Sequence, residues 1–357
     1  MKRLTLLAVC LILLMGAMPV GAATPPFKVA FLLADSPTDG GWNAAHGRGI
    51  DMVRALPGVQ VMVIEKVGYA EADIERAMEG VVANGAQLVF GTWFDARNVM
   101  AAGAEKYPGV LFEHCSGYPL VKSNGRNFST YFARMEQGDY IAGVIAAKHG
   151  CTSVGIVGTY AIPEPVRGLN WFTLGMQSVN PAATSKVVWI NSWLDPNAET
   201  LAAGALVDAG YTCIRQMADT PYSSIEACRT PGVTAIGYGT DARAKAPCTL
   251  VTNEWNWGPY YVEQVRAAMA GTWVSQDWYG GVAEGAVKMV GDPAEYQPLV
   301  DKFTAGFNPA CDVRGYENLS DGTKREHVVV GCQTDDDLLS MQWLVNGVDS
   351  AQPTIEK

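Results

Sequence analysis

The sequence has few of the residues that sites for metal ions and nucleic acids require. Its four histidines are dispersed along the chain, and no CxxC or His/Cys spacing typical of zinc occurs. The formal net charge is -10, and the lysines and arginines are scattered instead of forming a basic stripe. We therefore expect no bound metal, no cofactor and no nucleic-acid partner.

The sequence also lacks the motifs of common catalytic sites. It has no GxSxG nucleophile elbow and no phosphate-binding GxxxxGK[ST] loop, and the turn at Gly40 and Gly41 does not extend to GxGxxG. His114 and Cys115 are neighbours in a predicted strand, where adjacent side chains point to opposite faces, so they do not form a working catalytic pair. We predict that the protein is not an enzyme.

Beyond its N-terminus the sequence has no apolar run long enough to span a membrane. Residues 1–23 have the layout of a cleavable secretory signal, with Lys2 and Arg3, then a short apolar stretch, then small residues that end at Ala23. Cleavage at Cys10, as in a lipoprotein, is the alternative, but it would leave an exposed apolar leader. We expect a soluble mature protein in the periplasm that does not itself span the membrane.

The cysteine content predicts disulfides. Cys10 is one of eight cysteines, so seven remain in a chain that is exported to an oxidising compartment. Because seven is odd, we expect at least one thiol outside any disulfide. Cys311 and Cys332 flank a polar segment with turn signals and are the favoured pair. A second bridge is expected among Cys213, Cys228 and Cys248.

Short apolar or β-branched runs alternate with longer helix-like segments. This alternation predicts α/β structure with parallel sheets and helices on both faces. The pattern restarts near residue 153, and the length exceeds what one core serves, so we expect two doubly wound, Rossmann-like lobes. The expected strands are 27–34, 59–67, 86–92, 109–115, 127–133, 153–159, 186–193, 211–217, 234–239 and 249–255. After a last helix at 257–271 we expect an irregular acidic tail.

Aromatic, amide and acid side chains follow the predicted strands, where small polar turn residues are usual. Ligands of open α/β sheets bind outside the carboxyl ends of the strands, and aromatic rings there can stack on a planar ligand. The candidate ligand-binding residues are Trp42, Asn43, Phe94, Ser116, Trp193, Asp241, Asn253, Trp255 and Trp257.

These candidates also have structural interpretations. A tryptophan in a loop can be a lid over the core, because its large area favours burial. Trp255 and Trp257 can belong to the core of the last helix, and Asp241 can be a helix N-cap alone. Trp42 and Trp193 lie at equivalent strand ends of the two series, which favours a binding role for both.

Seven phrases follow one another along the mature chain: DGGWNAAH, FEHCSGY, ARMEQGDYIAGVIAAK, IPEPVRGLNWFTLGMQSVNP, WINSWLDPNAE, TNEWNWGPYY and LLSMQWLVNGV. Together they resemble the basic membrane protein family of substrate-binding proteins, the purine-binding components of ABC importers. The resemblance implies the type I periplasmic-binding-protein fold, with a hinge of crossover strands. The N-terminal lobe would contain residues 26–132 plus about 255–280, and the C-terminal lobe residues 133–254 plus about 281–357.

The resemblance implies roles for several residues. Trp42, followed by Asn43, stands where the family has an aromatic and a polar residue, and its ring would stack on a base. Trp193 would hold the opposite face, and Asp241 would accept hydrogen bonds from the base edge or a ribose. The phrase HCSGY lacks an aspartate, and NEWNWGPYY lacks a lysine, that nucleoside-binding members carry. These departures favour a free purine base such as adenine over a nucleoside.

The function implied is that of an extracytoplasmic solute-binding protein, which closes two lobes on a purine and delivers it to an inner-membrane permease and its ATPase. The alternatives are a ligand sensor that signals to a receptor, a sugar-binding protein of the same fold, and an exported enzyme such as a nucleoside hydrolase. We expect Arg134 and Glu136 to be salt-bridge partners at the hinge.

Overall fold

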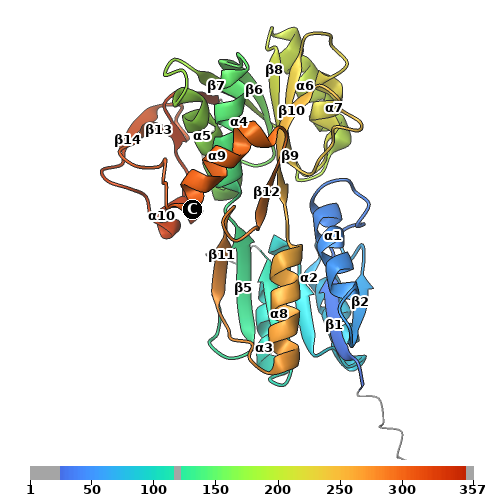
Figure 1. Ribbon diagram of the computed structural model, residues 1–357. Helices are drawn as coiled ribbons and strands as arrows, with labels where there is room; N and C mark the ends of the chain where they lie inside the picture. Colours follow the sequence, from blue (N-terminus) through green and yellow to red (C-terminus); the bar gives the residue numbers. More distant parts are fainter. Residues whose placement is uncertain (1–24, 116–121, 351–357) are drawn as a thin grey trace, which may run out of the picture.

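The computed structural model describes residues 25–115 and 122–350. The predicted signal segment and the candidate Ser116 therefore lie outside the described residues. Figure 1 shows two lobes, each with helices around a sheet. Two α/β lobes with largely parallel sheets are the predicted fold class, which is confirmed.

The first lobe is built on a six-stranded sheet of order β11-β5-β4-β3-β1-β2, in which every neighbouring pair is parallel. Alternate residues of its central strands face opposite sides. Phe31 packs with α1 and α8, and Leu32 packs with α2 and α3. The strands are β1 Phe27–Leu32, β2 Val59–Ile64, β3 Leu88–Gly91, β4 Leu111–Cys115, β5 Phe128–Ala133 and β11 Asp277–Gly280. The helices are α1 Trp42–Arg54, α2 Glu71–Ala83, η1 Phe94–Ala96, α3 Arg97–Lys106 and α8 Gly258–Ala270.

The second lobe has a seven-stranded sheet of order β12-β10-β9-β8-β6-β7-β16, and only the β10–β12 pair in it is antiparallel. Helices α6 and α7 pack together, and so do α4 and α5. The strands are β6 Ser153–Gly158, β7 Thr184–Trp189, β8 Cys213–Met217, β9 Thr234–Gly239, β10 Thr249–Trp255, β12 Val287–Val290 and β16 Val348–Ser350. The helices are α4 Met135–Lys148, α5 Pro163–Gln177, α6 Pro196–Asp208, α7 Tyr222–Ala227 and α9 Pro293–Thr304.

The chain passes between the two sheets three times. It leaves the first sheet after β5 to form α4, returns after β10 to form α8, and leaves again between β11 and β12. In Figure 1 these crossings lie at the narrow junction between the lobes. Each lobe is therefore assembled from segments that are distant in the sequence.

The expectation of an irregular tail was wrong for the described residues. A small sheet of order β14-β13-β15 follows α9, and β16 then joins the second sheet beside β7. Short strands carry too few residues for a period-2 pattern to stand out, which explains why the sequence did not predict them. The elements in this expected tail are β11, β12, α9 and β16, with the bounds given above, together with β13 Arg314–Asn318, β14 Lys324–Val328, α10 Asp335–Leu339 and β15 Leu344–Val345.

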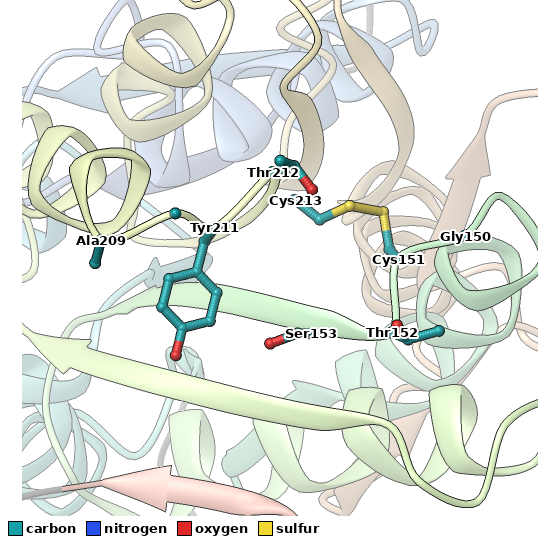
Figure 2. Close-up of a pocket in the computed structure, with 9 residues that line it drawn as sticks. Gly150, Cys151, Thr152, Ser153, Ala209, Tyr211, Thr212 and Cys213 are labelled. Carbon is teal, nitrogen blue, oxygen red and sulfur yellow. A yellow bond between two sulfur atoms is a disulfide. The ribbon is translucent and has the colours of Figure 1, made fainter.

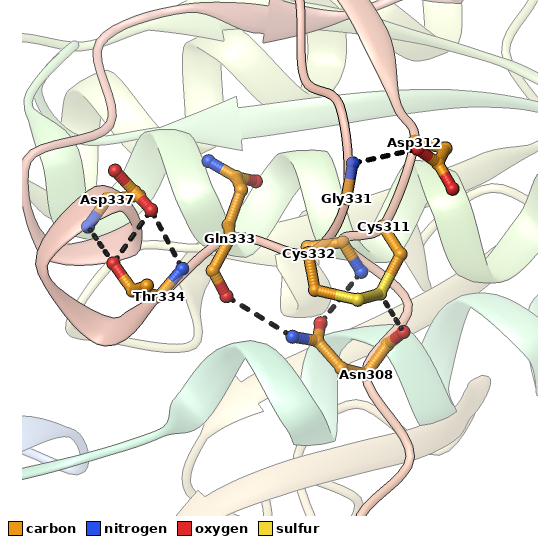
Figure 3. Close-up of a disulfide and its surroundings, with 9 residues drawn as sticks. Asn308, Cys311, Asp312, Gly331, Cys332, Gln333, Thr334 and Asp337 are labelled. Carbon is orange, nitrogen blue, oxygen red and sulfur yellow. Dashed lines mark hydrogen bonds between the residues drawn. A yellow bond between two sulfur atoms is a disulfide. The ribbon is translucent and has the colours of Figure 1, made fainter.

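Three disulfides lie in the second lobe and its extension. Cys311 and Cys332 bridge the start of β13 to the segment before α10, where Thr334 and Asp337 form a capping box (Figure 3). A second bridge joins Cys228 to Cys248. The bridge expected among Cys213, Cys228 and Cys248 is this Cys228–Cys248 pair, and the remaining Cys213 pairs with Cys151 across 62 residues. The Cys151–Cys213 pairing was not predicted, because these two cysteines meet only through the packing of β6 beside β8.

Within the described residues, every helix is too short or too polar to cross a bilayer.

Candidate ligand-binding site between the lobes

The carboxyl ends of strands from both lobes meet at one place. Trp42 follows β1, and its ring contacts those of Trp255 and Trp257, which end or follow β10. Gly41, one residue earlier, lies against Asp219, which follows β8. This is the sheet edge where ligands of α/β folds bind. We call it the interlobe site and define it by Trp42, Trp193 and Asp219.

Asp39 explains how Trp42 can occupy the first position of α1. The residue before the helix is Gly41, which has no side chain for capping. The carboxylate of Asp39 instead accepts hydrogen bonds from the backbone N–H groups of Gly41 (2.9 Å), Asn43 (3.0 Å) and Ala44 (2.9 Å). Because the helix start is capped from upstream, residue 42 is free to carry an aromatic ring.

The Trp42 ring is half-buried in an aromatic cluster. Its indole N–H donates to the backbone carbonyl of Thr92 at 3.0 Å, which fixes the ring against the first lobe. The ring meets His46, Trp255 and Trp257 edge-on, at centroid distances of 4.8, 5.2 and 5.8 Å. Trp255 and Trp257 stack on each other at 5.3 Å and are buried. The structure thus brings three predicted tryptophans together, with Trp42 the more exposed and the other two behind it.

Trp193 lies at the site from the second lobe. It is half-buried, and its ring meets Tyr160 edge-on at 5.0 Å. Its carbonyl accepts a hydrogen bond from the backbone N–H of Asp219 at 3.3 Å. No ring contact joins Trp42 to Trp193 in the part of the chain that the structure describes. The two rings predicted to stack on the ligand therefore come from opposite lobes and do not touch each other.

Asn43, Asp241 and Asn253 already have polar partners within their own lobes. The Asn43 side chain donates to Asp39 at 2.8 Å. Both Asp241 oxygens accept from the Arg243 guanidinium at 2.9 Å, and this pairing lowers the pKa of the Asp241 carboxyl. Buried Asn253 donates to Asp139 at 2.8 Å.

Phe94 lies in η1 after β3 and is half-buried. The guanidinium of Arg97 lies over its ring, with the central carbon 4.2 Å from the ring centroid. One face of Phe94 is thus covered by a cation.

Asp219 is a site residue that the sequence reasoning missed. Its side chain is half-buried between the lobes, and its carboxylate has no hydrogen-bond or ion-pair partner among the described residues. Burial, followed by the nearby charges of Glu164, Asp39 and Glu199, raises the pKa of Asp219 well above its usual range. The available signal was an acid two residues after a predicted strand, in MADTP, at the ligand-binding edge of a sheet.

Buried ion pairs hold the second lobe behind this site. Arg215 pairs with Asp139, and both side chains are almost fully buried. Arg167 pairs with Glu136 at 3.2 Å, while Arg134 pairs with Asp335 of α10. The two predicted hinge residues therefore form ion pairs with different partners. The Arg215–Asp139 and Arg167–Glu136 pairs are buried and therefore costly to break, because loss of one partner leaves an uncompensated charge, whereas Asp335 is exposed.

The interlobe site combines aromatic rings with acidic side chains. Besides Asp219, it has Glu164, whose Oε1 accepts from the Tyr238 hydroxyl at 2.7 Å and whose pKa is raised by burial. A site of this kind favours a planar ligand with N–H or O–H donors. No group of three or more metal-ligating side chains occurs among residues 25–115 and 122–350.

Two cavities lie away from this site. One, of about 260 Å³, lies at the amino ends of β6 and β8 (Figure 2). It is lined by Cys151, Tyr211 and Cys213 among others. The other, of about 160 Å³, lies between β5, β11 and α10. Neither includes a predicted ligand-binding residue.

Comparison with known proteins decides the family. The family model described as Bmp, ABC transporter substrate-binding protein PnrA-like, matches residues 27–304, which span both lobes. The chain belongs to the Bmp family of ABC transporter substrate-binding proteins. The resemblance seen in the seven sequence phrases is thereby confirmed, and so is the predicted class of function.

Two relatives and one solved structure illustrate the family and its fold. A purine-binding protein of Brucella abortus is 36% identical over 353 residues, which are 95% of this chain and 98% of that protein. A candidate glucose-binding protein of an ABC transporter from Haloferax volcanii is 34% identical over 253 residues, which are 69% of this chain and 62% of that protein. A solute-binding protein of an ABC transporter system from Conexibacter woesei superposes with a TM-score of 0.67 at 20% identity, covering 78% of this chain and 96% of that chain.

Proposed function

We propose that this Bmp-family protein binds a free purine base, adenine or a close analogue, at the interlobe site and delivers it to a membrane permease with its ATPase. It does so in the periplasm, after removal of residues 1–23, and without catalysing a reaction. The observation that carries the proposal is the contact between the loops of Trp42 and Asp219, which brings an aromatic ring and an unmatched carboxylate to one lobe junction, in a chain 36% identical to a purine-binding protein.

These two groups match the chemistry of a purine. Stacking of a base on an aromatic side chain contributes roughly 1–3 kcal/mol. The exocyclic amino group and ring N–H of adenine are donors, and a carboxylate is the strongest neutral-pH acceptor that a protein offers them. Trp193 supplies a second ring from the other lobe. A ligand held by both lobes stabilises their closed arrangement.

The hydrogen bonding of Asp241 supports a free base over a nucleoside as the ligand. This residue was expected to meet the base edge or a ribose, but its carboxylate is bonded to Arg243 through both oxygens. The sequence also lacks the aspartate and lysine of nucleoside-binding members. Fewer free polar groups are then available for ribose hydroxyls, whose burial without partners would be unfavourable.

A sugar is the second candidate ligand, and the Haloferax volcanii relative favours it. Tryptophan rings and carboxylates also suit a pyranose, which presents apolar faces and hydroxyl donors. Calorimetric titration of the purified protein with adenine, guanine, adenosine, inosine and D-glucose separates the candidates. We expect the tightest binding for a free base. Binding of D-glucose with no heat from any purine would refute the proposal.

The absence of catalysis is tested on the same protein. Incubation with adenosine or inosine, followed by chromatography, should show no released base. Release of base that depends on the protein concentration would instead support a nucleoside hydrolase.

A further inference from the structure

Two loops from different lobes meet at Gly41. The first, between β1 and α1, contains Gly40 and Gly41; the second, between β8 and α7, contains residues 219–221. A Cβ atom built on Gly41 would lie 1.2 Å from the Asp219 carbonyl oxygen and 3.2 Å from the Thr220 nitrogen. Real Cβ atoms essentially never approach another heavy atom within 3.0 Å. No side chain therefore fits at position 41 while the lobes hold this arrangement.

Neither loop can easily yield. The Gly41 N–H is bonded to Asp39, which also caps α1. On the other side, the buried Glu199 carboxylate accepts from the Thr220 hydroxyl and from the Tyr222 N–H. Moving either loop to make room would break hydrogen bonds of buried or half-buried groups, which is unfavourable because each group would be left unpaired.

The contact also joins the two central residues of the interlobe site. Gly41 directly precedes Trp42, and the atom that it approaches belongs to Asp219. Gly143 of α4 is also tight, but it approaches Phe172 of α5 within the second lobe. A side chain at Gly143 would therefore disturb one lobe, whereas a side chain at Gly41 would hold two lobes apart.

We propose that Gly41 is the closure contact of this protein, a positioning residue whose missing side chain lets Trp42 and Asp219 come together around the ligand. The proposal rests on the proposed function only for the choice of ligand, since the contact itself is made by the polypeptide. A larger residue at position 41 leaves each lobe folded and prevents complete closure.

The first test compares Gly41→Ala with Gly80→Ala, whose built Cβ meets nothing within 4 Å on the exposed side of α2. Adenine affinity is measured by calorimetry, ligand-free stability by thermal unfolding, and lobe closure by small-angle scattering with and without ligand. For Gly41→Ala we expect affinity lowered at least about tenfold, which is 1.4 kcal/mol, and no ligand-induced decrease in radius of gyration. Ligand-free unfolding of Gly41→Ala should stay close to that of wild type, and Gly80→Ala should unfold no earlier than wild type, because alanine favours a helix over glycine. Closure and affinity equal to wild type would overturn the proposal.

A second test needs no ligand. The Cβ built on Gly40 lies 3.9 Å from Cδ of Pro221, so cysteines in a Gly40→Cys/Pro221→Cys protein should be joined by a short bifunctional maleimide reagent when the lobes are closed. Because Gly40 has a φ of +82°, the Gly40→Cys single variant is the control for backbone strain. Adding Gly41→Ala should suppress the cross-link, which is read by mass spectrometry after proteolysis. Equal cross-linking with Gly and Ala at position 41 would contradict the proposal. Failure of wild type to bind adenine would refute the purine assignment alone, because the cross-link reports on closure separately.

Discussion

At the scale of single residues, the ability of an acid to bind the ligand depends on whether its carboxylate already has a hydrogen-bond partner in the protein. Asp219 and Asp241 both follow strands of the second sheet. The Asp241 carboxylate accepts hydrogen bonds from Arg243, whereas the Asp219 carboxylate has no partner among the described residues. The sequence shows both acids and not their partners. Strand-end position singled out Trp42 and Trp193 as candidates, but it could not distinguish a bonded carboxylate from one that faces the lobe junction.

Asp219→Asn should weaken adenine binding by about 1.5–3 kcal/mol. The N–H donors of the ligand favour the ionised form of Asp219, which burial disfavours in the ligand-free protein, and this charge-assisted hydrogen bond is lost in the variant with little change in shape. Asp241→Asn is the matched control and should bind adenine within about twofold of wild type. Both proteins are measured by calorimetry at pH 7. A larger loss in Asp241→Asn than in Asp219→Asn would contradict this assignment.

Trp42→Ala and Trp193→Ala should each lower purine affinity by roughly 1–3 kcal/mol if the rings stack on the ligand. Trp257→Ala tests the supporting role: its ring is fully buried, so we expect loss of stability of about 3–5 kcal/mol. Thermal unfolding and titration are compared for all three proteins. A Trp42→Ala protein that binds normally but unfolds much earlier would show that this ring is core.

At the scale of elements, two helices of the second lobe touch through their backbones. A Cβ built on Gly143 of α4 would lie 2.1 Å from the Phe172 carbonyl oxygen, and one built on Gly175 of α5 would lie 2.2 Å from that of Tyr140. The sequence predicted both helices from their apolar content, but not that glycines would set their separation. The distance between two packed helices depends on which residues of one helix face which residues of the other. The hydrophobic periodicity of a single segment carries no information about that partner.

Gly143→Ala should destabilise the fold by about 1–3 kcal/mol or more, because the helices must separate to admit a methyl group. Gly204→Ala in α6, where a Cβ meets nothing within 4 Å, is the control and should raise stability by about 0.5–1 kcal/mol, because alanine favours a helix over glycine. Urea unfolding followed by circular dichroism measures both. Ligand affinity of the folded Gly143→Ala protein should be unchanged, and a loss of affinity without a loss of stability would contradict this account.

A buried acid connects β4 to the helix that returns from the second lobe. Glu113 accepts from the Tyr260 hydroxyl at 2.8 Å and from the Trp273 indole N–H at 2.7 Å, and burial raises its pKa to about 7. Since the unfolded value is 4.5, the folded state binds the proton more tightly. This contribution to stability is complete below pH 4.5 and is lost as pH rises through about 7.

Glu113→Gln should therefore make the free energy of unfolding depend less on pH. Between pH 4.5 and 8 the wild type should lose about 3 kcal/mol that the variant does not lose. Urea unfolding at several pH values gives the two slopes, and the absolute stability of the variant serves only as a baseline. Parallel slopes for the two proteins would show that Glu113 does not titrate in this range.

At the scale of the whole molecule, the fold was predictable because its dominant signal is local. Runs of apolar residues separated by amphipathic helices predicted both parallel sheets, and two such series predicted two lobes. The extension after α9 was not predicted, because β15 has two residues and β16 three. Its elements are stabilised by partners elsewhere, such as β7 and the Cys311–Cys332 bridge.

The three passages of the chain between the lobes have a consequence for how such a protein can change. Neither lobe is encoded by one continuous stretch of gene, since β11 and α8 belong to the first lobe and follow most of the second in the sequence. A single recombination event cannot exchange one lobe for that of a relative. Substitution in strand-end loops changes the site without exchanging a lobe, and position 42 can accept such change because Asp39 already caps the helix that begins there.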